Sequence, residues 1–357
     1  MFRIATHKLR LRLISLPRII FIVAITTLFG CSQPAVVVYS GETMGTYYRV
    51  SYYGNEDYES HIQHILSNVN MSMSSWLPDS EINRFNSTPI GTPVQLSPEL
   101  CEVVSVAIQM NVFSDGAYDI SIGRAVSDLG FTPEIGGQAS NGEAIDQSNF
   151  INRQNIEEGD ALFMQGCELT RVTMTAIVDL SSIAKGFAVD QIGRFLESRG
   201  VTQYLVDIGG ELRAGDYKPD GSPWRIAVEV PDIDGGVQHV IELANMAIAT
   251  SGDYRNFREI AGEIESHLID PSSGRSVHSR LTSVSVLNAS AMKADAWATA
   301  LFVMGPERAI ITADRSETPV YMLLRSEQND AVSELGASIE PASVEVLANS
   351  FWHDHFE

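Results

Sequence analysis

The sequence lacks the short motifs that identify several large enzyme classes. It contains no G-x-G-x-x-G after a strand-like segment, no G-x-x-x-x-G-K-[ST], no G-x-S-x-G and no H-E-x-x-H. These absences argue against a Rossmann enzyme, a P-loop enzyme, an α/β-hydrolase and a zincin metalloprotease. Any catalytic chemistry must therefore come from residues outside these motifs.

Cysteine is scarce, and the histidines are scattered. The chain has 3 cysteines and 8 histidines, and none of their spacings is typical of a zinc site. Two cysteines, Cys101 and Cys167, lie in the body of the chain. They would form one disulfide in an oxidising compartment or remain as two free thiols, and the sequence does not choose between these states.

Basic residues are few. The chain has 24 Lys and Arg against 45 Asp and Glu, which gives a formal net charge of −21. Residues 1–30 hold five of the basic residues and no acidic residue, so their removal would change the charge from −21 to −26. Nucleic acid phosphates would repel so acidic a body, and we expect no nucleic acid binding.

The N-terminus differs in kind from the rest of the chain. A basic segment is followed by the apolar run IIFIVAITTLFG, which is too short to span a membrane comfortably, and this arrangement predicts a secretion signal. The run ends in LFGC, which resembles the lipobox at which a bacterial signal peptidase cuts before a cysteine that then carries lipid. We therefore predict a lipoprotein signal peptide over residues 1–30 and a tether over residues 31–40 that starts at lipid-modified Cys31.

This signal predicts a mature protein on the periplasmic side of a bacterial membrane, held there by lipid on Cys31. Ser32 follows the cysteine, where Asp is associated with retention at the inner membrane. The outer membrane is therefore slightly favoured, and both membranes remain open. The alternative is an uncleaved membrane anchor.

The composition and the periodicity predict one globular body. With 44% hydrophobic residues, the chain can bury a large core. Helical stripes such as Ile62, Leu66 and Val69 alternate irregularly with strand-like segments such as QYLVDIGG, PWRIAVEV and TSVSVLNAS. Because no regular βαβ repeat is present, we predict an α+β fold with largely antiparallel or mixed sheets and packed helices, over residues 41–357.

The apolar segment SAMKADAWATALFVMG, residues 290–305, contains a carboxylate and a hydroxyl on one predicted helix face. Asp295 and Thr299 are four residues apart, so the helical pitch stacks their side chains. In one interpretation Asp295 serves the first turn of the helix and Thr299 bonds back to a main-chain carbonyl. In the other, the two oxygens hold a hard cation such as Mg²⁺. These residues alone favour the first interpretation.

Three further polar residues have both structural and functional interpretations. In VDLSSIAKGFAVD, Asp179 lies at a strand end and Lys185 in the first turns of the next helix. A lysine there is usually on a solvated face, but a helix N-terminus with a nearby lysine is also a suitable phosphate site. His267 in HLIDPSSGR is the only histidine beside a strand end, a turn and charged groups. A lone histidine is more often structural than catalytic.

Eight sequence blocks, taken together, favour the functional interpretations of these residues. In chain order they are GETMGTYYRV, MSSWLPDSEINRFN, GAYDISIGRAVSDLGF, VDLSSIAKGFAVDQIGRFL, YLVDIGGELRAGD, AIATSGDYRNF, HLIDPSSGRSV and KADAWATALFVMG. They resemble the blocks of the ApbE family, the FAD:protein FMN transferases, from about residue 41 to residue 305. Each block alone is a weak signal, and eight in order are a strong one. The resemblance implies a single compact ApbE-like body that is related to the T-fold.

The resemblance implies a reaction as well. A Thr or Ser hydroxyl of a client protein would attack the FMN phosphate of FAD with the help of Mg²⁺, leaving FMN attached through a phosphoester and releasing AMP. The implied clients are flavoproteins such as subunits of sodium-translocating NADH:quinone reductase or of Rnf-type complexes. Two alternatives stay open: an FAD pyrophosphatase that yields FMN and AMP, and a periplasmic lipoprotein that binds FAD without catalysis.

The family pattern also implies which residues contact FAD. These contacts are implied at Met44, Trp76, Ala117, Tyr118, Asp119, Asp179, Lys185 and Ile269. Trp76 and Tyr118 offer aromatic faces of the kind that stack on flat rings. We therefore expect these eight residues, which are far apart in the sequence, to surround one FAD-binding cavity.

Metal ligands and a base are implied in the same way. The metal ligands would be Asp295, Thr299 and the main-chain carbonyl of Ser182. Ala298 departs from family members that carry a second acid just before the Thr, so the ion would depend more on phosphate oxygens and water, which suits Mg²⁺. His267, in the H-x-x-D-P-x-x-G block, is the implied group that takes the proton from the client hydroxyl.

Overall fold

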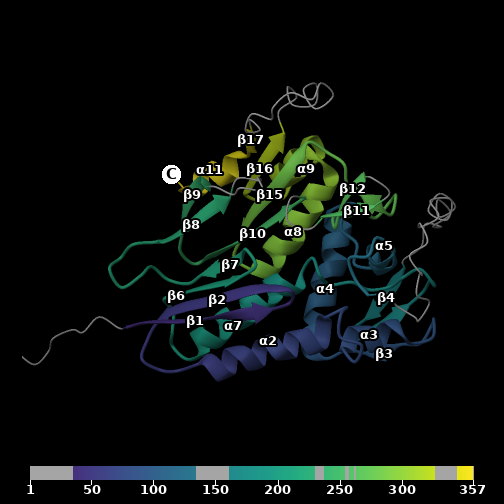
Figure 1. Cartoon of the computed structure of the whole chain (residues 1–357), viewed down its shortest axis with the longest axis horizontal. Coiled ribbons are helices and arrows are strands. Elements are labelled where there is room, and N and C mark those ends of the chain that lie inside the picture. The colour runs from purple at the N-terminus through teal and green to yellow at the C-terminus, as the bar shows by residue number, and fades with distance from the viewer. Residues whose placement is uncertain are drawn as a thin grey trace, which may run out of the picture.

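The computed structural model describes residues 35–133, 161–229, 237–253, 257–260, 263–325 and 344–356, and it is built around one eight-stranded sheet (Figure 1). The predicted signal peptide and Cys31 lie outside these residues. The strand order is β1-β2-β6-β7-β10-β15-β16-β17, and every neighbouring pair is antiparallel. The strands are β1 Val36–Thr43, β2 Thr46–Tyr53, β6 Tyr204–Ile208, β7 Glu211–Ala214, β10 Met246–Gly252, β15 Leu281–Asn288, β16 Val320–Arg325 and β17 Val344–Ala348.

The long helices lie on one face of this sheet, and α11 (Ser350–Phe356) packs on the other. The four long helices are α2 Glu59–Met73, α4 Pro98–Phe113, α7 Ala184–Ser198 and α8 Ala291–Met304. The stripe predicted for α2 is confirmed, because Ile62, Leu66 and Val69 are buried in the main core. The α8 helix packs on β10 and β15, and α7 packs on β6 and β7. The described residues also form four shorter helices: α3 Glu81–Asn86, α5 Gly123–Asp128, α9 Pro306–Arg315 and α11 Ser350–Phe356.

A hairpin covers the opposite face. β8 (Trp224–Glu229) and β9 (Val237–Leu243) pair in antiparallel fashion, and apolar side chains of both strands pack with Leu287, Leu323 and Trp352 in a second core. β15 therefore lies between two apolar layers, and seven of its eight residues are buried. This explains why its sequence, LTSVSVLN, lacks charged residues on either face.

The two cysteines in the body of the chain form a disulfide. Cys101 of α4 is bonded to Cys167, which lies in the turn between β4 (Leu162–Gln165) and β5 (Glu168–Arg171), with 5.3 Å between the Cα atoms. These two strands and β3 (Val94–Gln95) make a small sheet in the order β3-β5-β4. Of the two states that the sequence left open, the structure therefore shows the disulfide.

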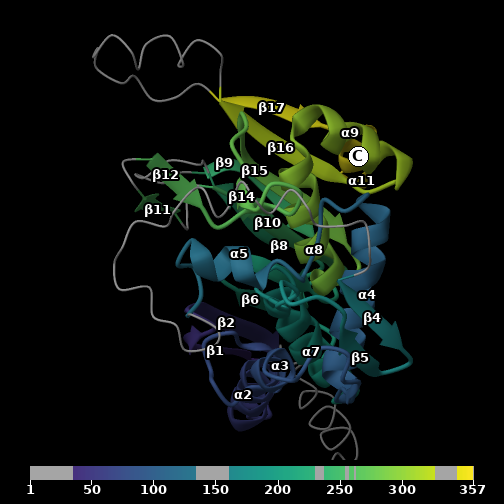
Figure 2. The same cartoon turned by 90° about the vertical axis from the view of Figure 1, so that its right-hand side faces the viewer.

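Two short hairpins lie beside α5. They are β11 Phe257–Ile260 with β12 Glu263–Ser266, and β13 Ile269–Asp270 with β14 Arg275–Ser276. Ile260 and Ile269 pack with apolar residues of α5, and Figure 2 shows the β11–β12 hairpin close to that helix. The predicted α+β fold in one body is thus confirmed. Within the described ranges, no helix is both long and apolar enough to cross a membrane.

Candidate active site

One cavity collects the residues that the sequence singled out. It has a volume of about 590 Å³ and lies between the β1–β2 turn, the C-terminal end of α2, the N-terminal end of α7, β10, α8 and the hairpins beside α5. Twelve predicted residues line it: Met44, Trp76, Ala117, Tyr118, Asp119, Asp179, Ser182, Lys185, His267, Ile269, Asp295 and Thr299. The structure thus brings all of them together, and the role of each one stays a prediction.

The α8 helix presents its carboxylate and its hydroxyl to this cavity. Oδ2 of Asp295 accepts a hydrogen bond from the main-chain N–H of Gly186 on α7, at 3.1 Å. Oγ1 of Thr299 contacts Oγ of Ser251, at the end of β10, at 3.1 Å. The interpretation that the residues alone favoured is wrong for Asp295. The first turn of α8 starts at Ala291, holds no acid, and leaves Asp295 to bond to another helix.

Burial governs the charge of Asp295. Its side chain is buried, and this burial raises the pKa of Asp295 to about 8 because the charged form loses its water. The ammonium of Lys185 and the N–H of Gly186 lower this pKa, and the nearby carboxylate of Glu211 raises it. A carboxylate in such a place is stabilised in its charged form by a cation at close range.

The chemistry of Asp295, Thr299 and Ser182, which line the same cavity, suits a hard cation. A carboxylate, a hydroxyl and a main-chain carbonyl are all oxygen donors, which Mg²⁺ prefers. Within the described part of the chain, no three His, Cys, Asp or Glu residues come together as a metal-binding group. An ion here would therefore take its remaining ligands from substrate and water.

Ala298 does not contribute to this set. It is fully buried in the main hydrophobic core and is not among the residues that line the cavity. Position 298 precedes Thr299 by one residue, so its side chain points about 100° around the helix from that of Thr299. In this chain the alanine there packs in the core and offers no ligand atom.

A lysine and a glutamate form an ion pair at the cavity wall. Nζ of Lys185, in the first turn of α7, pairs with Oε1 of Glu211 at the start of β7. The side chain of Glu211 is only 3% exposed. The sequence analysis did not single out Glu211, although this residue lies in the block YLVDIGGELRAGD. The pair fixes the lysine inside the cavity instead of on a solvated helix face.

Two of the predicted acids shape the loops that carry them. Oδ2 of Asp179 accepts from the hydroxyl of Ser75 at 2.6 Å, and Oδ1 accepts from the main-chain N–H of Ser181 at 3.0 Å. Oδ1 of Asp119 accepts from the N–H of Ser121 at 2.7 Å. Such side-chain to main-chain bonds stabilise turns. Asp179 therefore ties the segment after α2 to the segment before α7 across the cavity.

The two predicted aromatic contacts differ in exposure. Trp76 is 60% exposed at the cavity mouth, whereas Tyr118 is 2% exposed, so the protein already covers almost all of its ring. The hydroxyl of Tyr118 accepts a hydrogen bond from Oγ of Ser182 at 3.0 Å, and burial raises the pKa of this phenol above its ordinary value. Trp76 is therefore the better stacking surface, and Tyr118 supports the loop that carries Ser182.

The β1–β2 turn brings Met44 to the cavity in a strained conformation. Met44 has a φ of 50° and Gly45 a φ of 72°, both in the left-handed region that non-glycine residues seldom adopt. Nδ2 of Asn70, near the end of α2, donates to Oγ1 of Thr43 at 3.2 Å and so holds this turn against the helix. Strain of this kind persists only where surrounding contacts impose it.

His267 follows β12 and lies at the side of the cavity formed by the short hairpins. Its ring meets Phe131 edge to face, with 6.2 Å between the ring centroids. The guanidinium of Arg258, on β11, lies over the ring of Phe131, 5.7 Å from its centroid. Sequence reasoning missed both Phe131 and Arg258, which also line the cavity. A signal was available in principle, because the phosphate binding that the family resemblance implies calls for more than one cation.

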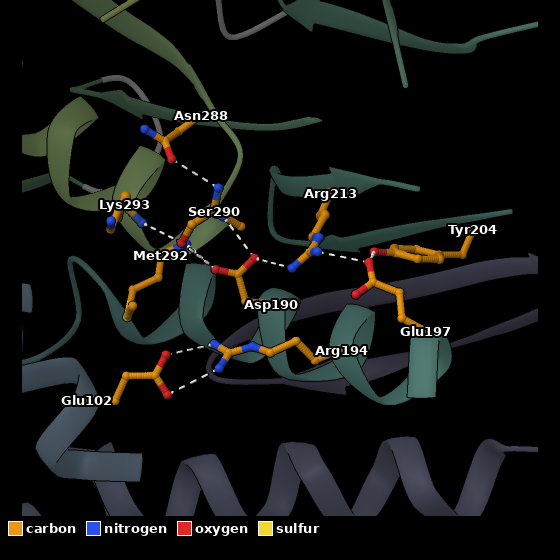
Figure 3. Close-up of polar contacts among 11 residues, drawn as sticks. Glu102, Asp190, Arg194, Glu197, Tyr204, Arg213, Asn288, Ser290, Met292 and Lys293 are labelled. Carbon is orange, nitrogen blue, oxygen red and sulfur yellow. Dashed lines mark hydrogen bonds and ion pairs between the residues drawn. The ribbon is translucent and has the colours of Figure 1, made fainter. Parts of the chain in front are cut away.

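A buried carboxylate fixes the start of α8 against α7, as Figure 3 shows. Asp190 of α7 is 2% exposed, and its Oδ1 accepts from the N–H of Ala291 and from Arg213, each at 3.0 Å. Its Oδ2 accepts from the hydroxyl of Ser290 at 2.6 Å and from the N–H of Met292 at 3.1 Å. These bonds satisfy N–H groups that a helix N-terminus leaves free. The helix that carries the cavity carboxylate is thereby held in place at its first turn.

The sequence is similar to a family of flavin transferases. Residues 44–323 match the ApbE family. The FAD:protein FMN transferase of Vibrio cholerae is 38% identical over 329 residues, which cover 90% of this chain and 96% of that protein. The FAD:protein FMN transferase of Haemophilus influenzae is 36% identical over 324 residues, which cover 87% and 92% of the two chains.

Solved structures show the same likeness. The flavin transferase ApbE from Vibrio cholerae superposes with a TM-score of 0.76 at 35% identity, over 90% of this chain and 99% of that chain. The apo form of the Pseudomonas stutzeri flavinyl transferase ApbE gives a TM-score of 0.76 at 31% identity, over 91% and 98%. The likeness thus extends over nearly the whole of each chain and is not confined to one motif.

Proposed function

The chain belongs to the ApbE family, and from this membership we propose that it transfers the FMN part of FAD to a Thr or Ser hydroxyl of a client protein, with release of AMP. It is an enzyme of the flavin transferase type. The observation that carries the proposal is the shared cavity, where Asp295 and Thr299 of α8 and His267, which follows β12, line one space. Its volume of about 590 Å³ is in the range of cofactor-sized sites.

The reaction exchanges one phosphorus–oxygen bond for another. The client hydroxyl oxygen bonds to the phosphorus of the FMN phosphate, and the bond from that phosphorus to the bridging oxygen of the pyrophosphate breaks. AMP leaves with the bridging oxygen, and FMN stays on the client as a phosphoester. The site must therefore neutralise charge on the phosphates and accept one proton from the client hydroxyl.

Residues on α7 and α8, together with Ser182, would neutralise the charge on the phosphates. Asp295, Thr299 and the carbonyl of Ser182 would hold Mg²⁺, which when bound offsets the charge that develops on the pyrophosphate. The N–H of Gly186 orients the carboxylate of Asp295. Lys185 adds a fixed positive charge at the N-terminal end of α7, where phosphate groups are also favoured by the helix dipole.

Proton removal falls to His267. A neutral imidazole accepts the proton of the client hydroxyl through one ring nitrogen as the new bond forms. The edge-to-face contact with Phe131 helps to hold the ring at the cavity wall. Arg258, on the same side, would contact a phosphate or the rim of the bound FAD.

Flavin binding uses the mouth of the cavity. Trp76 is exposed there and offers a flat surface on which a flavin or adenine ring would stack. Met44, which lines the same cavity, adds a flexible thioether that suits aromatic rings. Ala117, Asp119, Asp179 and Ile269 complete the proposed contacts.

We also propose that the protein works on the periplasmic side of a bacterial membrane, anchored by lipid on Cys31. The support is the LFGC segment and the disulfide between Cys101 and Cys167, since disulfides persist in oxidising compartments. The proposed clients are exported or membrane-associated flavin subunits, such as those of sodium-translocating NADH:quinone reductase or of Rnf-type complexes.

Co-expression with a candidate flavin subunit tests the function. We expect the subunit to become fluorescent in a denaturing gel, and an acceptor Thr→Val variant of the subunit to stay dark. With purified proteins, FAD and Mg²⁺, we expect AMP to appear in step with labelled client. Fast AMP release without any client would instead indicate a pyrophosphatase, and tight FAD binding without AMP under any condition would indicate a binding protein.

A further inference from the structure

A second hollow opens along the edge of the sheet from the cavity that we propose binds FAD, which we call the FAD cavity. This second hollow has a volume of about 980 Å³ and lies between the β1–β2 hairpin and α2, and we call it the β1–α2 groove. Five lining residues are common to the groove and the cavity: Met44, Gly45, Asn70, Ser74 and Trp76. The two spaces therefore meet at the β1–β2 turn.

The walls of the groove are built into the fold. Gly41 of β1 lies over the ring of Tyr48, and a Cβ there would be 2.8 Å from that ring, so the wall has this shape only with glycine. The opposite wall is α2, where Gln63 and Ser67 are exposed. Figures 1 and 2 both show α2 beside the β1–β2 hairpin.

The end of the groove nearest the cavity is apolar. Met71, Trp76 and Leu77 line it, and their side chains are 47%, 60% and 37% exposed. Exposed apolar groups gathered at the mouth of a site are typical of surfaces that bind another molecule. A ligand in the groove would therefore gain apolar contacts immediately before it reaches the cavity.

The groove also borders an open sheet edge. β1 is the outermost strand on its side of the sheet, and no strand in the described part of the chain pairs with its outer edge. Such an edge presents N–H and C=O groups that an extended peptide can pair with. Val36 and Val38, along the same strand, are half exposed. Main-chain pairing favours a polypeptide over a small molecule as the occupant.

We propose that the β1–α2 groove binds the acceptor segment of the client protein in an extended conformation, with its acceptor hydroxyl entering the cavity past Met44 and Trp76. The inference rests on the proposed function. Transfer needs a second polypeptide at a cavity that FAD itself fills, so the client must approach through an opening that is continuous with it. The groove is such an opening.

The charge of the groove limits which client segments it can bind. The groove is lined by two acids, Glu42 and Glu59, and by no Lys or Arg among the described residues. Like charges across an interface are unfavourable, so an acidic stretch is excluded beside these two residues. The client segment should place neutral or basic residues there and an apolar residue near Met71 and Leu77.

A pair of neighbouring substitutions on α2 tests the groove. Ser67→Arg places a long cation in the groove from an exposed helix position, whereas Asn68→Arg adds the same side chain at an exposed position outside it. The probe is the purified flavin subunit that is labelled in the co-expression test. We expect Ser67→Arg to raise the KM for this subunit by about tenfold or more, because the arginine occupies the path and repels basic residues. FAD affinity and the melting temperature should stay at wild-type values, and Asn68→Arg should match wild type throughout.

A photo-crosslinker gives a second, positive measurement. With benzoylphenylalanine at position 63, in the groove, we expect a crosslink to the acceptor segment of the same purified subunit, and none with the crosslinker at position 68. Wild-type KM in Ser67→Arg together with no crosslink from position 63 would overturn the groove while the transferase function stands. A wild-type enzyme that labels no subunit would overturn the proposed function, and the groove inference with it.

Discussion

The main-chain N–H of Gly186 on α7 donates a hydrogen bond to Oδ2 of Asp295 on α8, at 3.1 Å. The two helices come this close because residue 186 has no side chain: a Cβ there would lie 2.4 Å from the carbonyl oxygen of Ala291. A buried carboxylate thus receives a donor that its own helix cannot supply. The same contact sets the distance between α7, which carries Lys185, and the carboxylate on α8.

Asp295→Asn separates the metal role from a structural one. Asparagine keeps an oxygen that can accept from Gly186 and removes the negative charge that Mg²⁺ requires. We expect FMN transfer to fall below detection at ordinary Mg²⁺ concentrations, while the free energy of unfolding changes by less than about 1 kcal/mol. Transfer across a Mg²⁺ titration and thermal unfolding measure the two effects.

The matched control on α8 is Lys293→Gln. Lys293 is exposed on the same helix and does not line the FAD cavity. The Lys293→Gln substitution should leave both the Mg²⁺ dependence of transfer and the stability of the protein unchanged. If Asp295→Asn retained normal Mg²⁺-dependent turnover, the acid would be structural, and the metal ligands would have to be sought elsewhere around the cavity.

His267→Ala tests the proton acceptor. The side chain lines the cavity beside Phe131, and its removal takes away the base without touching the proposed ligands Asp295 and Thr299. We expect client labelling to slow by about 100-fold or more, as general-base catalysis usually contributes, with FAD affinity retained. Single-turnover labelling and FAD fluorescence titration measure these quantities. Labelling at the wild-type rate would assign His267 a structural role.

Local sequence patterns predict some of this site because they depend on helix and strand geometry alone. Asp295 and Thr299 share a face through the helical pitch, and the stripe of α2 follows from its spacing. The blocks that resemble the ApbE family gave the other cavity residues, and the structure places them together. These patterns do not predict contacts between distant segments. The hydrogen bond between Gly186 and Asp295 is such a contact.

The residues that sequence reasoning missed are of the same kind. Glu211 reaches Lys185 only because β7 lies beside the start of α7, and Arg258 with Phe131 reaches the cavity only because the β11–β12 hairpin packs on α5. The disulfide was left open for a similar reason, since Cys101 and Cys167 are 66 residues apart. Burial of Tyr118 is likewise a property of the assembled core, and it removes most of the stacking face that its residue type suggested.

Cys31→Ser tests the proposed membrane anchor. If lipid on Cys31 holds the acidic body at the membrane, serine at this position should release the protein to the soluble fraction or block processing of the precursor. Membrane fractionation and the mass of the mature N-terminus measure this. Unchanged membrane association with normal cleavage before residue 31 would contradict the lipoprotein assignment.

Removal of the disulfide should lower stability without changing the chemistry. The bond joins positions 66 residues apart, and loss of such a crosslink costs about 4 kcal/mol in the chain-entropy account. Neither cysteine lines the FAD cavity, so the Cys101→Ala, Cys167→Ala double variant should keep wild-type transfer at 25 °C. Denaturant unfolding of the wild type with and without reductant provides the matched comparison. Identical unfolding curves in the two conditions would show that the bond contributes nothing to stability.

The last prediction compares the carboxylates of Asp190 and Glu102, which Figure 3 shows on and beside α7. Both form ion pairs, and only Asp190 is buried. Asp190 accepts three hydrogen bonds from the start of α8 and one from Arg213 of β7. Glu102 instead pairs with Arg194 at the surface, where the two side chains are 39% and 42% exposed. We expect Asp190→Asn to lower the free energy of unfolding by about 3 kcal/mol or more, since its amide nitrogen cannot accept two of these bonds. Glu102→Gln should cost less than about 1 kcal/mol.

The same pair of variants shows whether the hydrogen-bond network of Asp190 also positions the proposed metal ligands. With α8 released at its first turn, Asp295 would no longer be held at its present position, so Asp190→Asn should need more Mg²⁺ for half-maximal transfer at a temperature where it is still folded. FAD affinity should change little, since Asp190 does not line the cavity. Glu102→Gln should keep the wild-type Mg²⁺ titration. If Asp190→Asn lost stability but kept that titration, the network would stabilise the fold, and Gly186 alone would position Asp295.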